Sequence, residues 1–563
     1  MRRYPNCTSS LPLINPDDGY ENQQLVDAEL TARTSTASNL DQAYLWLIAC
    51  CDTHSICRKS QKEPVASYPT RLLDLGCEDS KEWRLITTVE SLCYSTHQPY
   101  LALSYRWDAH SKLLLLTSTL DSFRVGKPIM ELPCTFRDLV TVARRFRILY
   151  LWIDALCIVQ DSPKDWEYEA LRMRSVYANS ACTVAASASS DETEGLFRSR
   201  NPESFKPGLI RVPVTHSESQ ICQIFERDYW NLNISRGPLH KRGWVFQERH
   251  LSTSVLYFAN DQILWECREG AKCEGFPEGI PYYLSDKNLD YLWQLRERER
   301  ETGKEADEGN EEFKMPGEIY VLWRDLLKRF TDCSFTKVEE KLPAFAGIAK
   351  LFQEVTGDEY IAGLWRSRFF EGLDWHVAEP RHKTSLKYRA PSWPWASIDG
   401  PVEPEFSRLD STYLFDIIDV KVTPRCSDAT GAITDGYLKI RACLWKPILI
   451  NVEPHGSCIS FGLHTSTRLE VQIDCLDTAL VEGAIMYCFA FSSFLSDGYL
   501  EETPSVSFIC LEPLTGLDVL KYRRTGWLKV DGKGRLASLG MQSDEHGLMV
   551  PDRDRGFSDI IIV

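Results

Sequence analysis

The chain has 563 residues, a length too great for one ordinary domain, and chains of this size usually hold roughly two to four domains. Apolar residues make up 43% of it, which supports packed cores and excludes a disordered chain. The net charge of −16 excludes a generally basic surface of the kind that binds nucleic acid or anionic membranes.

The first 24 residues contain no apolar core of the kind found in secretory signals, and neither end carries a lipidation motif. The 19 cysteines are an odd number in a large acidic chain. We therefore expect reduced, mostly buried thiols in a cytoplasmic protein, not a disulfide framework.

The polar segment 1–40 has no periodicity and is predicted to be poorly ordered. A helical N-terminal extension is expected over 41–83, with helical spacing over 40–54 and a short strand in "PTRLLDLG" that ends at Gly76.

The densest group of metal-ligand residue types lies in this extension, in "ACCDTHSIC". Cys51, His54 and Cys57 recur every three residues, so one helix would align them. Zinc prefers four such ligands, and no second Cys/His pair at a matching spacing lies nearby. We expect no metal site here and interpret the cysteines, Cys50 included, as small buried residues; metal binding is the alternative.

An α/β domain is predicted over 84–270. Strands and amphipathic helices alternate in it, in a βαβαβ order that favours a parallel sheet with right-handed crossovers. The predicted strands are "WRLITTVE", "YLALSYRW", "ILYLWID" (148–154) and "ACTVAAS" (181–187), and the helices cover 135–146 and 165–179. Thr135 and Asp138 resemble a capping box at the start of the first helix.

In a parallel sheet the ligand crevice lies beyond the carboxyl ends of the strands. The residues expected there are the stretch 105–108 after the first buried strand, Asp154 after the second and Ser187 after the third. Polar groups from distant parts of the sequence are thus expected to converge.

The stretch "KRGWVFQERHLS" (241–252) reads as a helix that leads into a hairpin over 254–267. Its Trp244, Glu248 and Arg249 allow two interpretations. Glu248 and Arg249 could anchor the helix through a structural ion pair, or Trp244 and Glu248 could form one wall of a reaction site.

A helical region is predicted over 271–384, interrupted by a charged, solvated insertion at 296–312. Short alternating runs then predict a β-rich domain over 385–563, a sandwich or open barrel. The most apolar run, 479–495, is short for a membrane span and carries Glu482, so a buried strand is expected.

Three blocks in order carry a family resemblance: "YLALSYRWD" (100–108), the long block 132–189 and "PLHKRGWVFQERHLS" (238–252). With them the chain resembles the fungal heterokaryon-incompatibility (HET) domain family over roughly residues 41–400. The resemblance implies a flavodoxin- or TIR-like parallel-sheet domain and a role in allorecognition and programmed cell death. It also implies action through self-association or a protein partner. From the net charge and the shortness of the most apolar run we expect no nucleic-acid partner and no membrane span.

The same blocks are similar, more distantly, to TIR domains, and "RGWVFQE" matches the helix with the W-x-x-x-E pattern of enzymatic members. This resemblance implies that Glu248 is the catalytic residue of an NAD glycohydrolase, with NAD as substrate and no cofactor required. The residues implied in binding are Ser104, Tyr105, Arg106, Trp107, Asp108, Asp154 and Trp244.

One position departs from the family pattern S-Y-x-W-G, because Asp108 replaces its glycine. The added negative charge would weaken phosphate binding there. Two alternatives to the enzyme are a non-enzymatic interaction module and a HET-like scaffold recruited to specialised metabolism. Walker A, G-x-G-x-x-G and G-x-S-x-G motifs are missing from the core, so ATPase, Rossmann dehydrogenase and α/β-hydrolase functions have no support.

Overall fold

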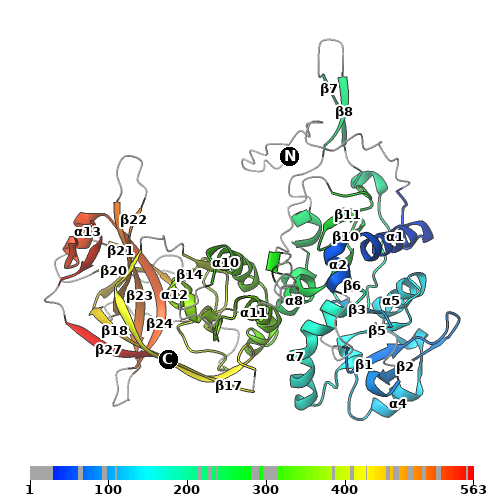
Figure 1. Cartoon of the computed structure of the whole chain (residues 1–563), viewed down its shortest axis with the longest axis horizontal. Coiled ribbons are helices and arrows are strands. Elements are labelled where there is room, and N and C mark those ends of the chain that lie inside the picture. The colour runs from blue at the N-terminus through cyan, green and yellow to red at the C-terminus, as the bar shows by residue number, and fades with distance from the viewer. Residues whose placement is uncertain are drawn as a thin grey trace. The chain divides into compact units, whose positions relative to one another are not determined.

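The chain folds into two compact units, Met1–Gln294 and Leu295–Val563. Figure 1 shows the computed structural model and labels its elements. The structure describes residues 30–60, 68–91, 98–107, 111–206, 208–213, 219–224, 230–235, 237–280, 289, 291–292, 295, 315–382, 387–405, 411–426, 428–451, 457–460, 468–477, 486–496, 503–514, 521–552 and 556–563. The charged insertion predicted at 296–312 lies outside them.

The first unit is built on a mixed sheet whose central strands are parallel. Among the described residues its order is β11-β10-β9-β6-β3-β5-β1-β2-β4. The parallel strands are β3 (Tyr100–Ser104), β5 (Tyr150–Trp152), β6 (Cys182–Ala185) and β9 (Ser254–Phe258). Antiparallel strands flank them: β1 (Arg71–Asp74), β2 (Glu82–Thr87) and β4 (Lys127–Pro128) on one side, β10 (Ile263–Cys267) and β11 (Gly270–Cys273) on the other. The predicted α/β class with a parallel centre is confirmed.

Both faces of this sheet are buried, which explains why its central strands read as apolar throughout. Strand β3 is fully buried and pairs in parallel with β5 and β6. Along β10, Ile263, Trp265 and Cys267 belong to one apolar core, whereas Leu264 belongs to a second. The side chains of a strand alternate between faces, so these are the cores on the two sides of the sheet.

Helices carry the chain between the parallel strands: α5 (Cys134–Arg145), α6 (Asp154–Cys157), α7 (Pro163–Asn179) and α8 (Gly243–Leu251). The start of α7 follows the usual rules, because Ser162 accepts from the amide of Asp165 and Pro163 occupies the first turn. The predicted capping box of α5 is wrong. The helix is preceded by Pro133 without a side-chain cap, and Asp138 Oδ2 instead accepts from the amide of Leu196 at 2.7 Å.

Upstream, helix α1 (Ala37–Thr53) packs against α5 and β10, and α2 (Ser55–Ser60) comes directly after it. The described part of the first predicted segment, 30–40, is built into this unit: Arg33 bridges to Ser199, and Leu40 is buried. The predicted strand before Gly76 is β1. Of the predicted strand from residue 84, the part after Thr87 forms the short helix α3 (Thr88–Ser91) instead.

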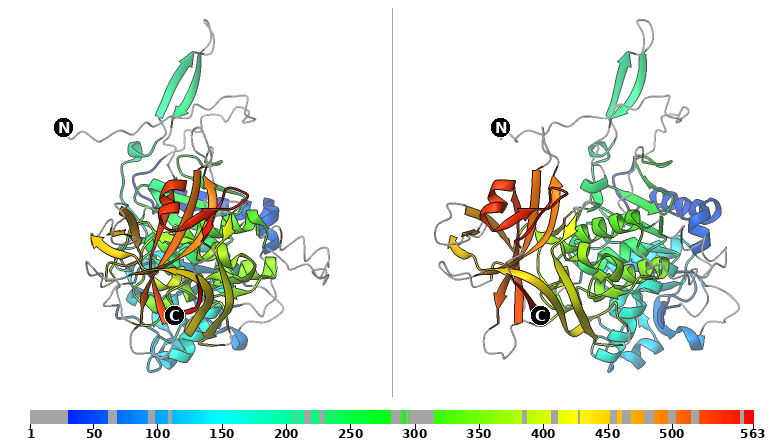
Figure 2. Two further views of the ribbon diagram at one scale, coloured as in Figure 1. Left: turned by 90° about the vertical axis from the view of Figure 1, so that its left-hand side faces the viewer. Right: turned by 60° about the vertical axis from the view of Figure 1, so that its left-hand side comes forward.

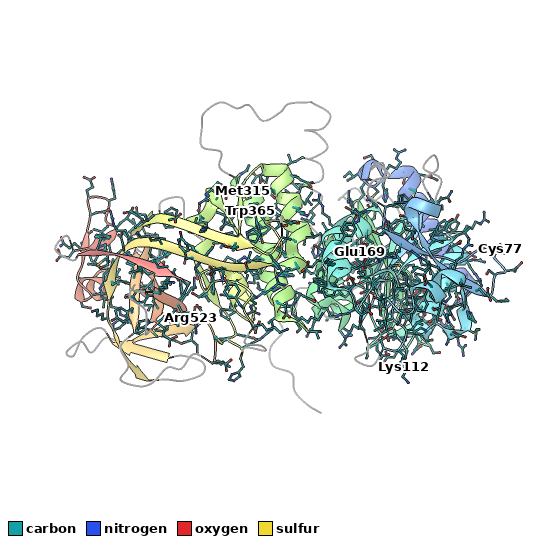
Figure 3. All side chains as sticks on the ribbon, turned by 90° about the horizontal axis from the view of Figure 1, so that it is seen from below. Cys77, Lys112, Glu169, Met315, Trp365 and Arg523 are labelled. Atoms are coloured by element: carbon teal, nitrogen blue, oxygen red, sulfur yellow. The ribbon has the colours of Figure 1, made fainter. Side chains whose placement is uncertain are left out.

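A two-stranded hairpin, β7 (Gly208–Pro213) and β8 (Ser219–Ile224), pairs only with itself among the described residues and stands apart from the main sheet (Figure 2). The cysteines of the described residues are free thiols and most are buried. Cys77 is an exposed exception at the outer edge of the first unit (Figure 3).

The second unit joins a helical part to a β-rich part. Helices α10 (Gly317–Thr331) and α11 (Pro343–Thr356) precede a largely antiparallel sheet. Its strands are β16 (Thr412–Tyr413), β17 (Phe415–Pro424), β18 (Ile433–Trp445), β19 (Ile448–Asn451), β20 (Ser457–Ser460), β21 (Arg468–Ile473), β22 (Tyr487–Ser496), β23 (Thr503–Pro513), β24 (Lys521–Asp531) and β27 (Phe557–Ile562). The predicted β-rich C-terminal region is confirmed, and the described part of the apolar run 479–495 lies mainly in β22. Within the described residues, no helix combines the length and the apolar character that a bilayer span requires.

The loop after β6 depends on one glycine, which generates a first prediction. Gly195 has φ +78°, and a Cβ there would lie 2.6 Å from Asp138 Oδ2. Gly195→Ala is therefore expected to lower the free energy of unfolding by about 2 kcal/mol, measured by urea denaturation. Gly534→Ala, in open space on helix α13 (Lys533–Ser538), is the control and should not destabilise. An equal effect of both changes would contradict this role of Gly195.

Candidate functional site

The carboxyl end of β3 supplies the first predicted site residues. Ser104 and Tyr105 are buried, with exposed fractions of 3% and 4%, whereas Arg106 and Trp107 are half-buried. Asp108 lies outside the described residues. The end of this strand therefore has a buried floor and a partly exposed rim.

Asp154 follows β5, the neighbour of β3, and opens helix α6. Trp107 Nε1 donates to Asp154 Oδ2 at 2.8 Å, and the amide of Ala155 donates to Oδ1 at 2.7 Å. Burial raises the pKa of Asp154, while the bonds from Trp107, Ala155 and Tyr105 and the charge of Arg242 oppose the rise. Of the predicted stretch 105–108, Tyr105 and Trp107 meet Asp154 in the structure as expected.

Glu248 lies on α8, and its side chain reaches the same place. It is only 6% exposed, and burial raises its pKa from 4.5 to about 7. The neighbouring Ser104 hydroxyl lowers this pKa, Asp154 raises it, and Arg242 lowers it. A buried carboxylate close to another carboxylate is the environment in which a carboxyl group titrates near neutrality.

Two polar atoms of this group are not satisfied. Within the described residues, Glu248 Oε2 and Ser104 Oγ are buried and have no hydrogen-bonding partner of ordinary geometry. The Tyr177 hydroxyl, which also lies beside Glu248, donates to the Leu103 carbonyl at 3.1 Å. Buried polar atoms are normally paired, and an unpaired carboxylate oxygen is one that a ligand can satisfy.

The neighbouring Arg249 settles which ion pair anchors α8. Its guanidinium binds Glu266 of β10, with Nη2 2.9 Å from Oε1, and both side chains are buried. Nε also donates to the Tyr257 hydroxyl at 3.1 Å. Arg249 thus ties the helix to β10 through Glu266, and Glu248 is not its partner in this ion pair. The sequence suggested a Glu248–Arg249 pair, and it contained no sign of Glu266 as the partner.

Trp244, one of the aromatic residues implied in binding, packs against a neighbouring helix. Trp244, half-buried at the start of α8, meets Trp166 of α7 edge to face, with ring centroids 6.1 Å apart. Arg106 lies near Asp191, whose pKa it helps to lower after the hydrogen bonds from Thr193. Trp244 thus packs against α7, and Arg106 interacts with Asp191.

Three further polar residues at the site were not predicted. Arg242 donates from Nη1 to the Tyr105 carbonyl at 2.7 Å and is close enough to lower the pKa of Asp154 and Glu248. Tyr177 comes from α7. His240 Nε2 lies 3.3 Å from Ser187 Oγ, the residue expected after the third strand. Arg242 stands two residues before Trp244, which begins the W-x-x-x-E pattern, and this position is the signal that could have identified it.

The second unit holds a cavity of about 680 Å³ that no sequence prediction identified. Its lining carries both charges, including Arg523 (Figure 3), Arg524 and Asp474. Arg524 and Asp474 form a buried ion pair, Nε to Oδ2 3.0 Å. Asp474 Oδ1 is buried without a hydrogen-bonding partner among the described residues, but Oδ2 is bound by a buried cation, so the carboxylate of this cavity is already paired with Arg524.

Residues 100–248 match the family model described as heterokaryon incompatibility protein (HET). The match begins at the first residue of β3 and ends at Glu248, so it includes the whole group of carboxylates. No curated protein and no solved structure matches the chain. The chain thus carries a HET domain at these residues, as the resemblance implied, and a HET domain suggests a role in heterokaryon incompatibility and cell death.

The raised pKa of Glu248 predicts an effect on stability. The carboxyl group of Glu248 is harder to ionise in the folded chain than in the unfolded one. The folded chain therefore loses stability as the pH rises from 4.5, the pKa of the unfolded state, to about 7, the pKa of the folded state. The gap between these pKa values corresponds to about 3 kcal/mol. Glu248→Gln is expected to raise the unfolding free energy at about pH 8 and to change it little near pH 4, measured by urea denaturation at both values.

Glu266 supplies the contrasting variant, since it is also a buried carboxyl group at α8. Glu266→Gln removes the charge that balances Arg249, and loss of one partner of a buried ion pair costs about 3–5 kcal/mol. Destabilisation by Glu248→Gln at about pH 8 comparable to that of Glu266→Gln would show that Glu248 is a structural ion-pair partner after all.

Proposed function

We propose that this chain is an effector of heterokaryon incompatibility whose HET domain hydrolyses the N-glycosidic bond of NAD, with Glu248 as the catalytic carboxylate. One observation carries the proposal. Glu248 is buried at the carboxyl end of the parallel strands, has a pKa of about 7, and its Oε2 has no ordinary hydrogen-bonding partner among the described residues. A buried carboxylate that is already positioned stabilises positive charge with a smaller reorganisation energy than a solvated carboxylate does.

The reaction suits a single carboxylate. The bond between ribose C1′ and the nicotinamide nitrogen breaks, and its electron pair stays with nicotinamide, which leaves as a neutral molecule. The ribose becomes oxocarbenium-like, and a water adds to C1′ and releases a proton. The leaving group needs no acid, so the protein has to stabilise the positive charge and orient the ribose.

We assign the remaining roles to residues around Glu248. Ser104, whose hydroxyl lies beside Glu248 and lowers the pKa of its carboxyl group, is assigned to donate to the carboxylate or to a ribose hydroxyl. Arg242 and the half-buried Arg106 are the cations assigned to the pyrophosphate. Trp107 and Trp244 at the rim are assigned to the nicotinamide side, with Trp107 held by Asp154. Asp108 would oppose the pyrophosphate charge.

Activation by assembly follows from the burial of the carboxylate. At 6% exposure, Glu248 is reached by substrate only when neighbouring groups move. Self-association of the HET domain, or a protein partner, would supply the free energy of that change. We propose that this takes place in the cytoplasm and needs no cofactor.

The direct test is nicotinamide release from NAD by the purified full chain, alone, with a crowding agent and as a forced oligomer. Activity is expected in the assembled states, and Glu248→Gln should lower it by about 100-fold or more, because it removes the charge that meets the oxocarbenium ion. Glu167→Gln, an exposed glutamate of α7, is the control and should keep full activity. Absence of nicotinamide release in every state, with cell killing unchanged by Glu248→Gln, would favour the non-enzymatic interaction module.

The rate should depend on pH through Glu248. The ionised carboxylate is the active form, so kcat/KM is expected to rise with pH and to level off above its pKa of about 7. The acid limb should be absent from the residual activity of Glu248→Gln. A profile that is flat between about pH 5 and about pH 9 would contradict this assignment.

A further inference from the structure

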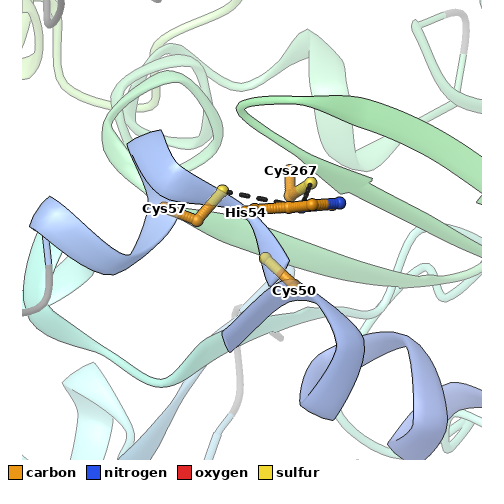
Figure 4. A group of neighbouring side chains, drawn as sticks. All are labelled: Cys50, His54, Cys57 and Cys267. Atoms are coloured by element: carbon orange, nitrogen blue, oxygen red, sulfur yellow. Dashed lines mark hydrogen bonds between the residues drawn. The ribbon is translucent and has the colours of Figure 1, made fainter. Parts of the chain in front are cut away.

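Four metal-ligand side chains meet in the first unit, away from the carboxylates. Cys50, His54 and Cys57 come from the α1–α2 segment, and Cys267 is the last residue of β10 (Figure 4). The three sulfurs and one histidine nitrogen all lie within 4.8 Å of one another. No second Cys/His pair lies nearby in the sequence, and the fourth residue of the group, Cys267, comes from more than 200 residues further along the chain.

These four residues differ from the three that the sequence placed on one helix, Cys51, His54 and Cys57. Helix α1 ends at Thr53, and His54 has extended backbone angles, φ −83° and ψ 114°, before α2 begins. This break replaces a continuous helical stripe, and Cys50 joins His54 and Cys57 in place of Cys51. Cys51 is only partly buried and packs at the edge of the apolar core.

The distances fit a single tetrahedral ion. Cys267 Sγ lies 3.3 Å and Cys57 Sγ 4.0 Å from His54 Nδ1. Around zinc, with Zn–S of about 2.3 Å and Zn–N of about 2.0 Å, sulfur and nitrogen ligands stand about 3.5 Å apart. A disulfide would use two of the three thiols and leave one unpaired, and the cysteines here are free thiols.

The three thiols are shielded from water. Cys50, Cys57 and Cys267 are at most 3% exposed. Glu269 Oε1 accepts from the amide of Ile56 at 2.6 Å, which joins the turn after β10 to α2. Such outer contacts orient metal ligands.

We propose that Cys50, His54, Cys57 and Cys267 bind one Zn²⁺ ion in a closed, structural site. Three thiolates and one imidazole are a common structural zinc ligand set, and four protein ligands leave no open position for catalysis. The ion would tie the α1–α2 segment to β10, at the end of the sheet where β10 and β11 continue from the last parallel strand.

Metal content is the first test. The full chain, purified from zinc-supplemented cells, is expected to hold about one zinc per chain by elemental analysis. Cys267→Ser and Cys57→Ser should lose it, whereas Cys51→Ser, the matched control beside the site, should retain it. His54→Cys should also retain it, since four thiolates form an equally good zinc site.

Cobalt substitution tests the geometry without any variant, in case those variants fail to fold. Co²⁺ added to the chelator-treated wild-type chain should give the intense visible bands of tetrahedral thiolate coordination, and Zn²⁺ should abolish them. The chelator should lower the thermal midpoint of the wild type and leave that of Cys267→Ser unchanged. Wild-type protein with neither bound zinc nor a tetrahedral cobalt spectrum would overturn the proposal, as would loss of zinc in Cys51→Ser alone.

Discussion

The site depends on the parallel pairing of one buried strand with both of its neighbours. Strand β3 pairs with β5 through Leu101 and Leu151 and with β6 through Leu101 and Cys182, so the carboxyl ends of all three strands lie at one edge. Trp107 and Asp154 are therefore joined by a hydrogen bond although 47 residues separate them in the sequence. Helix α8 completes the edge with Glu248. The register of three apolar strands thus brings together groups whose burial is unfavourable.

Adjacent residues of α8 show how the surroundings decide what a buried charge does. Arg249 meets Glu266, and each neutralises the other. Glu248, one position earlier, meets Asp154, a second carboxyl group, and Arg242, a cation that lowers its pKa. The first arrangement stabilises only the fold. In the second, burial of the carboxyl group is unfavourable in the free protein, and under the proposed function a cationic transition state would offset it.

Local patterns and the order of elements were enough to predict much of the first unit. The apolar runs identified β3, β5 and β6, and the topology rule brought Tyr105, Trp107 and Asp154 together correctly. The contacts that could not be predicted join distant segments and leave no local signal. Asp138 has the spacing of a capping residue but binds the amide of Leu196. Arg249 pairs with Glu266 rather than with the adjacent Glu248. No local sequence pattern identifies Cys267 as a fourth ligand.

Strand β10 joins these separate findings, because consecutive side chains on a strand point to opposite faces. Glu266 faces α8 and binds Arg249, while the next residue, Cys267, faces the α1–α2 segment and its thiols. One strand is therefore held by an ion pair on one face and, under our proposal, by a metal ion on the other. Loss of zinc would loosen β10. Because Glu266 of β10 binds Arg249, this change would be transmitted to α8, the helix that positions Glu248. The metal would then support the carboxylate site without contacting it.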